Sequence, residues 1–192
     1  MSLHGRLGRP QILTMQLTIR DSIDADIAAI AAIYGHAVRH GRASFETEPP
    51  DEAEIARRRA AILSAGLPYL VAELPGAGAV GYAYAGPYRP RAAYRFSLEN
   101  SIYIAPDRQG ARIGAALLPA LVARSEALGY RLMIAVIGDA ANQASIRLHA
   151  RCGFTHAGVL PAVGWKHGQW LDTVLMTRAL GPGANQPPPD AS

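Results

Sequence analysis

The sequence predicts an α/β domain in which helices cover both faces of a mixed sheet. Short apolar, β-branched runs typical of strands alternate along the chain with longer segments whose apolar residues recur at helical spacing. Two of these runs, 69–74 and 79–85, are joined by a Pro/Gly-rich turn typical of a hairpin, which gives antiparallel neighbours. Other runs are separated by helical segments, and such crossovers join parallel strands. Hairpins and crossovers in one chain imply a mixed sheet.

Two helices and four strands are expected up to residue 105. A strand at 17–20 precedes a helix from about Asp24, which ends at Gly41 and buries a face formed by Ile27, Ile30, Ile33, Tyr34, Ala37 and Val38. Asp51 has the position of an N-cap for the second helix, and Glu54 follows in a capping-box arrangement. The hairpin strands come next, and a strand at 100–105 follows them.

The rest of the chain is expected to form two helices and three strands. A helix from about Ala115 ends at Gly129 and buries Leu117, Leu118, Leu121 and Val122. The all-apolar run 132–137 indicates a central strand. A helix at 142–151 comes before the last two strands, at 154–160 and 173–179, with residues 165–170 in the link between them.

Length and composition favour one domain. With 192 residues the chain is long enough for a full core, expected here at 17–180. Residues 1–16 lack the apolar core of a signal peptide and are predicted to be an extension. Residues 181–192 are rich in Gly and Pro and are predicted to be a disordered tail. The single cysteine, Cys152, excludes an internal disulfide and favours a reducing cytoplasm.

Composition also argues against three kinds of partner. The net charge is +4, but the arginines are scattered and the only run, 57–59, spreads around a helix, which argues against a nucleic-acid surface. No apolar run has the length of a membrane span. No His/Cys group has the spacing of a zinc site, so no metal is expected. Anionic small-molecule phosphates account for the basic balance equally well.

A strand, a glycine turn and a helix follow one another around residue 110. The strand from Ile102 ends at Pro106, and Gly110 and Gly114 flank the turn that opens the next helix. Unpaired N–H groups and the helix dipole make such a point a pyrophosphate site. The lysine-bearing loop GxxxxGK[ST] and the dinucleotide loop GxGxxG are both absent.

The run Gln109-Gly110-Ala111-Arg112-Ile113-Gly114 resembles the acetyl-CoA loop of the GNAT N-acetyltransferases, with Arg112 where that family usually has its first glycine. We expect the turn to keep φ negative at Arg112, which leaves the guanidinium free to contact a CoA phosphate. The alternative is a strained arginine and a weakened site. The predicted element order also resembles the GNAT fold, whose twisted sheet is mixed and mostly antiparallel.

Three further segments, 86–101, 136–149 and 164–172, resemble phosphinothricin and methionine sulfoximine or sulfone N-acetyltransferases. The resemblance implies acetyl-CoA as cosubstrate, a small amino acid as acceptor and a cytoplasmic homodimer. Two other readings stay open. One is a GNAT enzyme that acetylates a polyamine, an aminoglycoside or a protein N-terminus. The other is a non-catalytic acyl-CoA-binding module.

Site residues follow from the same resemblance. Glu99 is the expected general base, against an ordinary loop-end glutamate in a salt bridge. His149 is a second proton acceptor, a group that orients the substrates, or a packed histidine. Asn142 is an N-cap that can also bond the pantetheine arm. The expected cofactor contacts are Ile102, Tyr103, Ile104, Gly110, Ala111, Arg112, Ile113, Gly114, Ala115 and Asn142.

The acceptor is expected to meet a loop rich in rings and guanidinium groups. Arginine can bind a carboxylate through two parallel hydrogen bonds, although a solvated basic loop would have the same composition. The expected acceptor contacts are Phe45, Arg89, Arg91, Tyr94, Asn100 and Ser101. Tyr103 is either a core residue or a proton donor to the leaving thiolate. The usual GNAT candidate for that donor is a tyrosine after the last cofactor helix, where this chain has Phe154.

Overall fold

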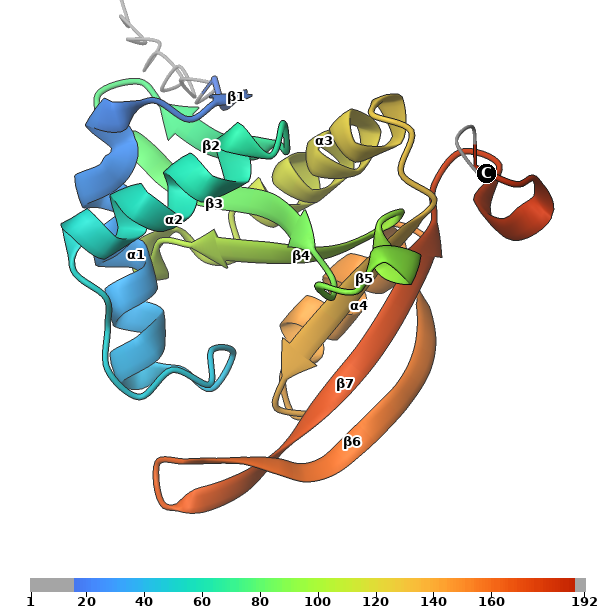
Figure 1. Ribbon diagram of the computed structural model, residues 1–192. Coiled ribbons are helices and arrows are strands. Elements are labelled where there is room, and N and C mark those ends of the chain that lie inside the picture. The colour runs from blue at the N-terminus through green and yellow to red at the C-terminus, as the bar shows by residue number, and fades with distance from the viewer. Residues whose placement is uncertain (1–15, 189–192) are drawn as a thin grey trace, which may run out of the picture.

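The computed structural model describes residues 16–188 and confirms the predicted order of helices and strands (Figure 1). The helices are α1 (Ile27–His40), α2 (Glu52–Ser64), α3 (Ile113–Ala127) and α4 (Gln143–Arg151). The strands are β1 (Thr18–Asp21), β2 (Tyr69–Leu74), β3 (Gly78–Pro87), β4 (Ser97–Ile104), β5 (Leu132–Gly138), β6 (Thr155–Lys166) and β7 (Gln169–Ala179). Residues 1–15, most of the predicted extension, lie outside the described range, as do 189–192.

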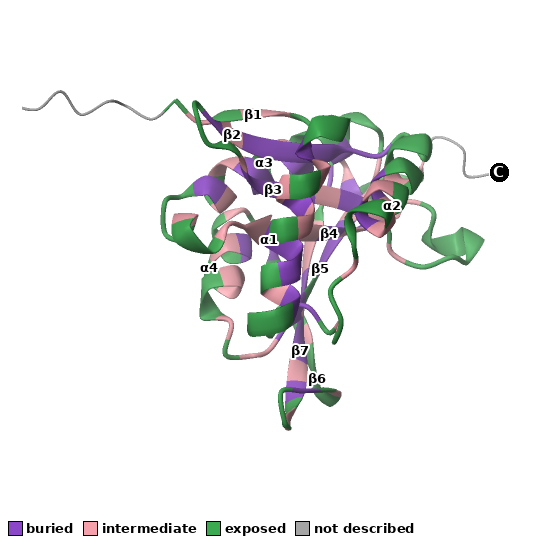
Figure 2. Cartoon of the chain, turned by 90° about the vertical axis from the view of Figure 1, so that its left-hand side faces the viewer, coloured by how far each residue is buried: buried purple, intermediate pink, exposed green. Residues whose placement is uncertain are grey.

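The strands form one sheet in the order β1-β2-β3-β4-β5-β7-β6, and β5 is central, as predicted. The β4–β5 pair is parallel and every other neighbouring pair is antiparallel, so the sheet is mixed and mostly antiparallel. Successive side chains of β2 point to opposite faces of the sheet and so belong to two separate hydrophobic cores. Tyr69 and Val71 pack under α1 and α2, whereas Leu70, Ala72 and Leu74 pack under α3. Burial is therefore concentrated on the central strands between the helices (Figure 2).

The sheet opens between β4 and β5, and this opening positions the site. The two strands are paired only from Ser97 and Leu132 to Asn100 and Ala135. Beyond these residues β4 continues to Ile104 paired with β3 alone, and β5 continues to Gly138 paired with β7 alone. The Ser101–Ile104 stretch of β4 therefore has a free edge in the middle of the sheet, where its backbone groups can accept an extended ligand.

The last hairpin is longer than predicted. Residues 165–170, expected to link the final strands, continue both of them, and only His167 and Gly168 form the turn, with φ of +52° and +73°. Irregular register between Leu160 and Gly164 interrupts the pattern that a regular strand would show. The hairpin projects beyond the helices (Figure 1). Its residues therefore lack the alternation of apolar and polar positions that is typical of a half-buried strand.

Two smaller predictions concern the cap of α2 and the C-terminal tail. Asp51 caps α2 as predicted, because its Oδ1 accepts from the Glu54 N–H at 2.8 Å. The Glu54 carboxylate, however, accepts from Arg57 and Arg58, so the reciprocal half of the capping box is replaced by ion pairs. In the predicted tail, Gly183–Asn185 form a short 3-10 helix and Gly183 is buried, and the disorder of 181–192 stays a prediction.

Candidate active site

Two cavities meet where β4 leaves β5. The first, called here the pocket, has a volume of about 420 Å³ and lies between β3, β4, β5, α4 and the connection from α1 to α2. The second, called the groove, has a volume of about 1130 Å³ and runs past the N-terminus of α3 and along α4. Both are lined by Ala43, Ile102, Tyr103, Asn142 and Ser145. A ligand in the groove can therefore reach a second ligand in the pocket at this junction.

The predicted glycine turn lines the groove, but its conformation differs from expectation. Arg112 is the N-cap of α3 with φ +60° and ψ +14°, in the left-handed region, so the expected negative φ was wrong. The turn keeps the geometry that a glycine would adopt freely, and the arginine is strained in it. Gly114 has a different reason: a Cβ there would lie 2.9 Å from Leu148, so its absence lets α3 and α4 approach.

The groove is basic, and no Asp or Glu is among the residues that line it. Of the predicted cofactor contacts all but Ala111 line the groove. Its arginines are Arg108, Arg112, Arg147, Arg151 and Arg178. Sequence analysis predicted only Arg112 and missed the other four, although the four-residue spacing of Arg147 and Arg151 on a predicted helix was a usable signal. This charge suits a ligand that carries several phosphates.

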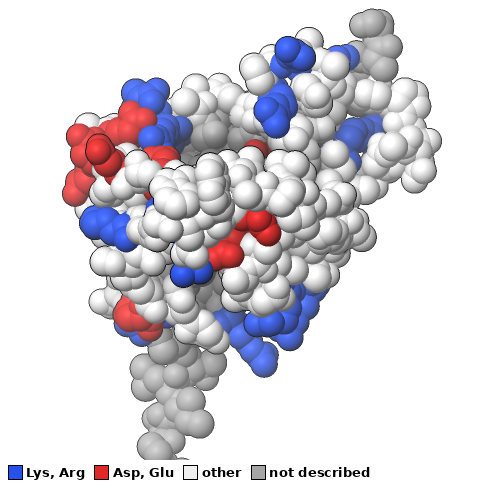
Figure 3. Space-filling view, turned by 90° about the horizontal axis from the view of Figure 1, so that it is seen from below, with Lys and Arg blue, Asp and Glu red and all other residues white. Residues whose placement is uncertain are grey.

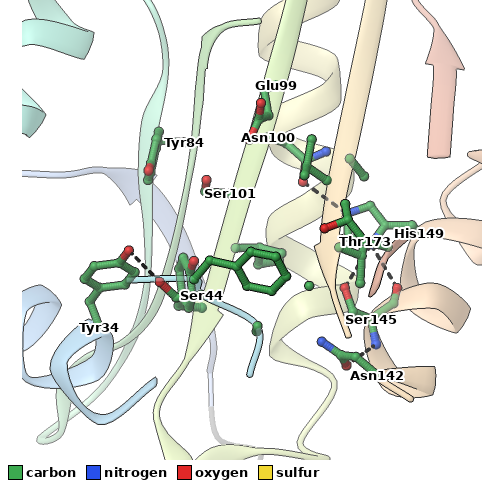
Figure 4. A pocket seen from close by; sticks show the side chains of 18 of the residues that line it. Tyr34, Ser44, Tyr84, Glu99, Asn100, Ser101, Asn142, Ser145, His149 and Thr173 are labelled. Atoms are coloured by element: carbon green, nitrogen blue, oxygen red, sulfur yellow. Dashed lines mark hydrogen bonds between the residues drawn. The ribbon is translucent and has the colours of Figure 1, made fainter. Parts of the chain in front are cut away.

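Glu99 lines the pocket from β4, as Figure 4 shows. Its carboxylate is half-buried and makes no hydrogen bond or ion pair within residues 16–188. Burial raises its pKa, and the charge of Arg89 opposes this only in part. The expected alternative, a salt-bridged loop-end glutamate, is therefore not what the described residues show. A half-buried carboxylate without a partner is suited to accept a proton from a ligand in the pocket.

His149 and Asn100 form a buried pair across the opening. The Asn100 Nδ2 donates to Ile134 O at 3.1 Å, so its Oδ1 faces His149 Nε2 at 3.0 Å. The other ring nitrogen, Nδ1, lies 2.8 Å from Ser145 O and 3.3 Å from Ser145 Oγ, whose hydroxyl can donate to it when the ring is neutral. Burial lowers the pKa of His149, and both ring nitrogens are occupied, which favours the orienting role over that of a free proton acceptor. Asn142 caps α4, as predicted, by accepting from Ser145 N at 3.2 Å.

The opposite wall comes from the connection between α1 and α2. Phe45, one of the expected acceptor contacts, lines the pocket, and buried Ser44 adjoins it. The Tyr34 hydroxyl donates to Glu46 Oε1 at 2.7 Å and lies 2.9 Å from Ser44 Oγ, and Arg58 also binds Glu46. Sequence analysis missed Tyr34, Tyr84 and Glu46 as pocket residues, since nothing local marks them.

The basic loop lies outside the pocket of this single chain. Arg89, Arg91 and Tyr94 are exposed and are not among the pocket residues, and Arg89 lies over the ring of Tyr88. Ser101 and Asn100 do line the pocket. The charged side chains that line it are the carboxylates of Glu46 and Glu99, with no lysine or arginine. Carboxylate recognition by the arginines of the loop stays a prediction.

Residues 16–188 hold neither a cluster suited to a metal ion nor a membrane-spanning helix. No group of three or more His, Cys, Asp or Glu side chains is placed to hold a metal ion within this range. In the same part of the chain, none of the helices combines the length and apolar character needed to cross a bilayer.

The sequence is similar to those of known acetyltransferases. The sequence profile of the Acetyltransferase (GNAT) family matches residues 30–154. The chain is 57% identical to a phosphinothricin N-acetyltransferase of Alcaligenes faecalis over 166 residues, which are 86% of this chain and 84% of that protein. It is 39% identical to an L-methionine sulfoximine/L-methionine sulfone acetyltransferase of Pseudomonas aeruginosa over 176 residues, 90% of this chain and 100% of that one.

A solved structure agrees with these relatives. The crystal structure of a GNAT superfamily phosphinothricin acetyltransferase from Sinorhizobium meliloti in complex with AcCoA superposes with a TM-score of 0.88. It shares 47% sequence identity, and the match covers 92% of this chain and 95% of that one. The fold, the glycine turn and the sequence matches all lead to the same assignment: the chain belongs to the GNAT family of acetyltransferases.

Proposed function

We propose that this protein transfers the acetyl group of acetyl-CoA to the primary amine of a small amino acid of the phosphinothricin, methionine sulfoximine or methionine sulfone type. One observation carries the proposal: the pocket that holds Glu99 opens onto a basic groove at the free edge of β4. The names and identities of the relatives support the same substrate class.

The groove binds acetyl-CoA. The N–H groups around Gly110 and the N-terminus of α3 hold the pyrophosphate, and the groove arginines add positive charge. The free edge of β4 between Ser101 and Ile104 hydrogen-bonds the amides of the pantetheine arm. One N–H of this edge polarises the thioester carbonyl, and losing such a donor typically costs about 3–4 kcal/mol of barrier.

Glu99 acts as the general base. The acceptor amine enters as an ammonium, Glu99 takes its proton directly or through a water, and the neutral nitrogen attacks the thioester carbon. A C–N bond forms, the C–S bond breaks, the CoA thiolate leaves, and the nitrogen gives up its second proton to solvent as it becomes an amide. Tyr103 lies at the junction of pocket and groove, and burial keeps its pKa well above the ordinary value. Tyr103 therefore stays protonated at neutral pH, and its position at the junction makes it our candidate donor to the thiolate.

A second acceptor class has one observation in its favour. Glu46 and Glu99 make the pocket acidic, and an acidic pocket suits polyamines or other acceptors that carry only positive charge. An amino acid needs a cation for its carboxylate, and we assign that role to Arg89. Its side chain lies outside the pocket of the single chain, but its charge already acts on Glu99.

A panel of acceptors separates the two classes. Release of free CoA thiol is measured with methionine sulfone, methionine sulfoximine, phosphinothricin, their decarboxylated amines and spermidine. We expect the amino acids to have the highest kcat/KM. If the decarboxylated amines or spermidine react as fast, the amino-acid assignment is wrong. The matched variant Glu99→Gln should lower kcat by roughly 10²–10⁴-fold and leave acetyl-CoA affinity unchanged.

We further infer a cytoplasmic homodimer, formed through the β6–β7 hairpin. The hairpin exposes Trp165 and Trp170, with 58% and 64% of their surface accessible, together with Val159, Leu160 and Val163. Seen from the hairpin end, much of the face is uncharged surface around a small acidic group at its centre (Figure 3). Such a patch marks an interaction site. Sedimentation should give a dimer, and Trp165→Ser with Trp170→Ser should give a monomer; a monomeric wild type would refute the inference.

A further inference from the structure

Lys166 is the only lysine among the 192 residues, and it is buried. It ends β6 with 4% of its surface accessible. Its Nζ donates to the backbone carbonyl of Ser44 at 2.6 Å, and no carboxylate in residues 16–188 lies within ion-pair distance of it. The other cations of the chain are all arginines. A lone buried ammonium bound to a neutral carbonyl calls for a reason.

The stability of the fold does not explain why Lys166 is buried. Removing an ammonium from water is costly, and one bond to an uncharged carbonyl compensates only part of the loss. In line with this, burial lowers the pKa of Lys166, and only the more distant charge of Glu46 opposes the shift. A lysine that does not stabilise the fold is expected to serve function.

The segment that Lys166 holds is the outer wall of the pocket. Ala43, Ser44, Phe45 and Glu46 all line the pocket and belong to the connection between α1 and α2. Ser44 Oγ in turn lies beside the Tyr34 hydroxyl, a contact drawn in Figure 4. Fixing the Ser44 carbonyl therefore also fixes the hydroxyl and carboxylate groups that face the acceptor.

The wall packs against β5 and β6, on the opposite side of the opening from β4. A Cβ at Gly164 on β6 would lie 2.4 Å from the Phe45 ring, and one at Gly138 on β5 would lie 2.7 Å from Arg42 O. Two weaker ties flank this recess: an exposed Arg42–Asp139 ion pair at 3.2 Å and a His167 ring nitrogen 3.2 Å from Gly41 O. Of these polar ties, only the one from Lys166 is buried.

We propose that Lys166 is a positioning residue for the acceptor: it clamps the wall 43–46 across the opening between β4 and β5. The pocket then has the right shape only while the C-terminal hairpin holds the α1–α2 connection. The proposal rests on the proposed function, because the ligand whose binding it controls is the amino acceptor. Acetyl-CoA binding is expected to be nearly independent of it, since Lys166 does not line the groove and the wall shares only Ala43 with it.

The test compares Lys166→Met with His156→Gln, a control on the same strand whose exposed side chain does not contact the wall. In Lys166→Met we expect the acceptor KM to rise roughly 10- to 100-fold, because a small misplacement of a substrate wall has effects of this size. The acetyl-CoA KM and the denaturation midpoint should stay at the wild-type values, and Lys166→Arg, which keeps a donor, should recover part of the acceptor affinity. An acceptor KM within about twofold of wild type would overturn the proposal.

A second measurement uses the wild-type protein, so it tests the positioning role of Lys166 even if Lys166→Met fails to fold. Lysine labelled with ¹³C at Cε gives one NMR signal. We expect it to move as methionine sulfone is added to the protein saturated with CoA, along the binding curve of the acceptor. A signal that does not move refutes the clamp. Inactivity of the wild type on every amino acid would refute the proposed function instead, so the two failures are distinguishable.

Discussion

Replacing Arg112 by glycine should stabilise the protein and weaken its hold on acetyl-CoA. The φ of +60° at Arg112 costs an L-residue about 1–2 kcal/mol. Glycine removes this strain but loses about 0.5–1 kcal/mol more chain entropy on folding. The difference is a net gain of roughly 0.5–1 kcal/mol in the free energy of unfolding, or up to about 4 °C in Tm for a chain of this size.

The effect on the cosubstrate has the opposite sign. Arg112 is exposed and lines the groove, so the substitution removes one solvent-screened cation from the phosphate site. An exposed ion pair is worth about 0.2–1 kcal/mol, which corresponds to a Kd at most about fivefold higher. Because the lost interaction is one that salt screens, the salt dependence of acetyl-CoA binding should also become smaller.

Denaturant unfolding and calorimetric titration with acetyl-CoA at two salt concentrations measure both effects. Ala162→Gly is the matched control, because Ala162 also has a positive φ, +50°, but lies on β6 and does not line the groove. It should gain similar stability and bind acetyl-CoA unchanged. Tighter acetyl-CoA binding by Arg112→Gly would show that the arginine is a defect in the loop, and a loss of stability would refute the strain argument.

Three further predictions concern the pocket and α4. Burial raises the pKa of Glu99, and the base must be ionised to accept a proton. The value of kcat/KM should therefore fall as the pH drops through a value above the ordinary glutamate pKa near 4.3, which a pH profile measures. The same fall in Glu99→Gln would show that Glu99 is not the base. Gly164→Ala should push the Phe45 ring and raise the acceptor KM at constant acetyl-CoA KM in steady-state kinetics, and equal changes in both would argue against a local effect. Asn142→Ala should lose about 1 kcal/mol of stability in denaturant unfolding, and an unchanged midpoint would deny its capping role.

Local sequence patterns predicted most of the fold and half of the candidate site. The position of the glycine turn, the strand that leads into it and the caps Asp51 and Asn142 depend on neighbours within a few residues, and the structure has these as predicted. Glu99 was identified through a resemblance, and its partnerless, half-buried carboxylate was added by the structure. The φ of Arg112 was predicted wrongly because the turn, and not its residue, set the backbone there.

The sequence by itself determined the order of the elements and the sheet class, since hydrophobic period and turn chemistry act over short distances. The place of the cosubstrate was predicted through the resemblance of the glycine turn. Only the tertiary structure decided the acceptor pocket. The Asn100–His149 pair joins residues 49 positions apart and the Lys166–Ser44 bond joins residues 122 apart. Contacts this distant leave no periodic trace in a sequence, because they form only where the opening of the sheet brings β4, α4, the hairpin and the α1–α2 connection together.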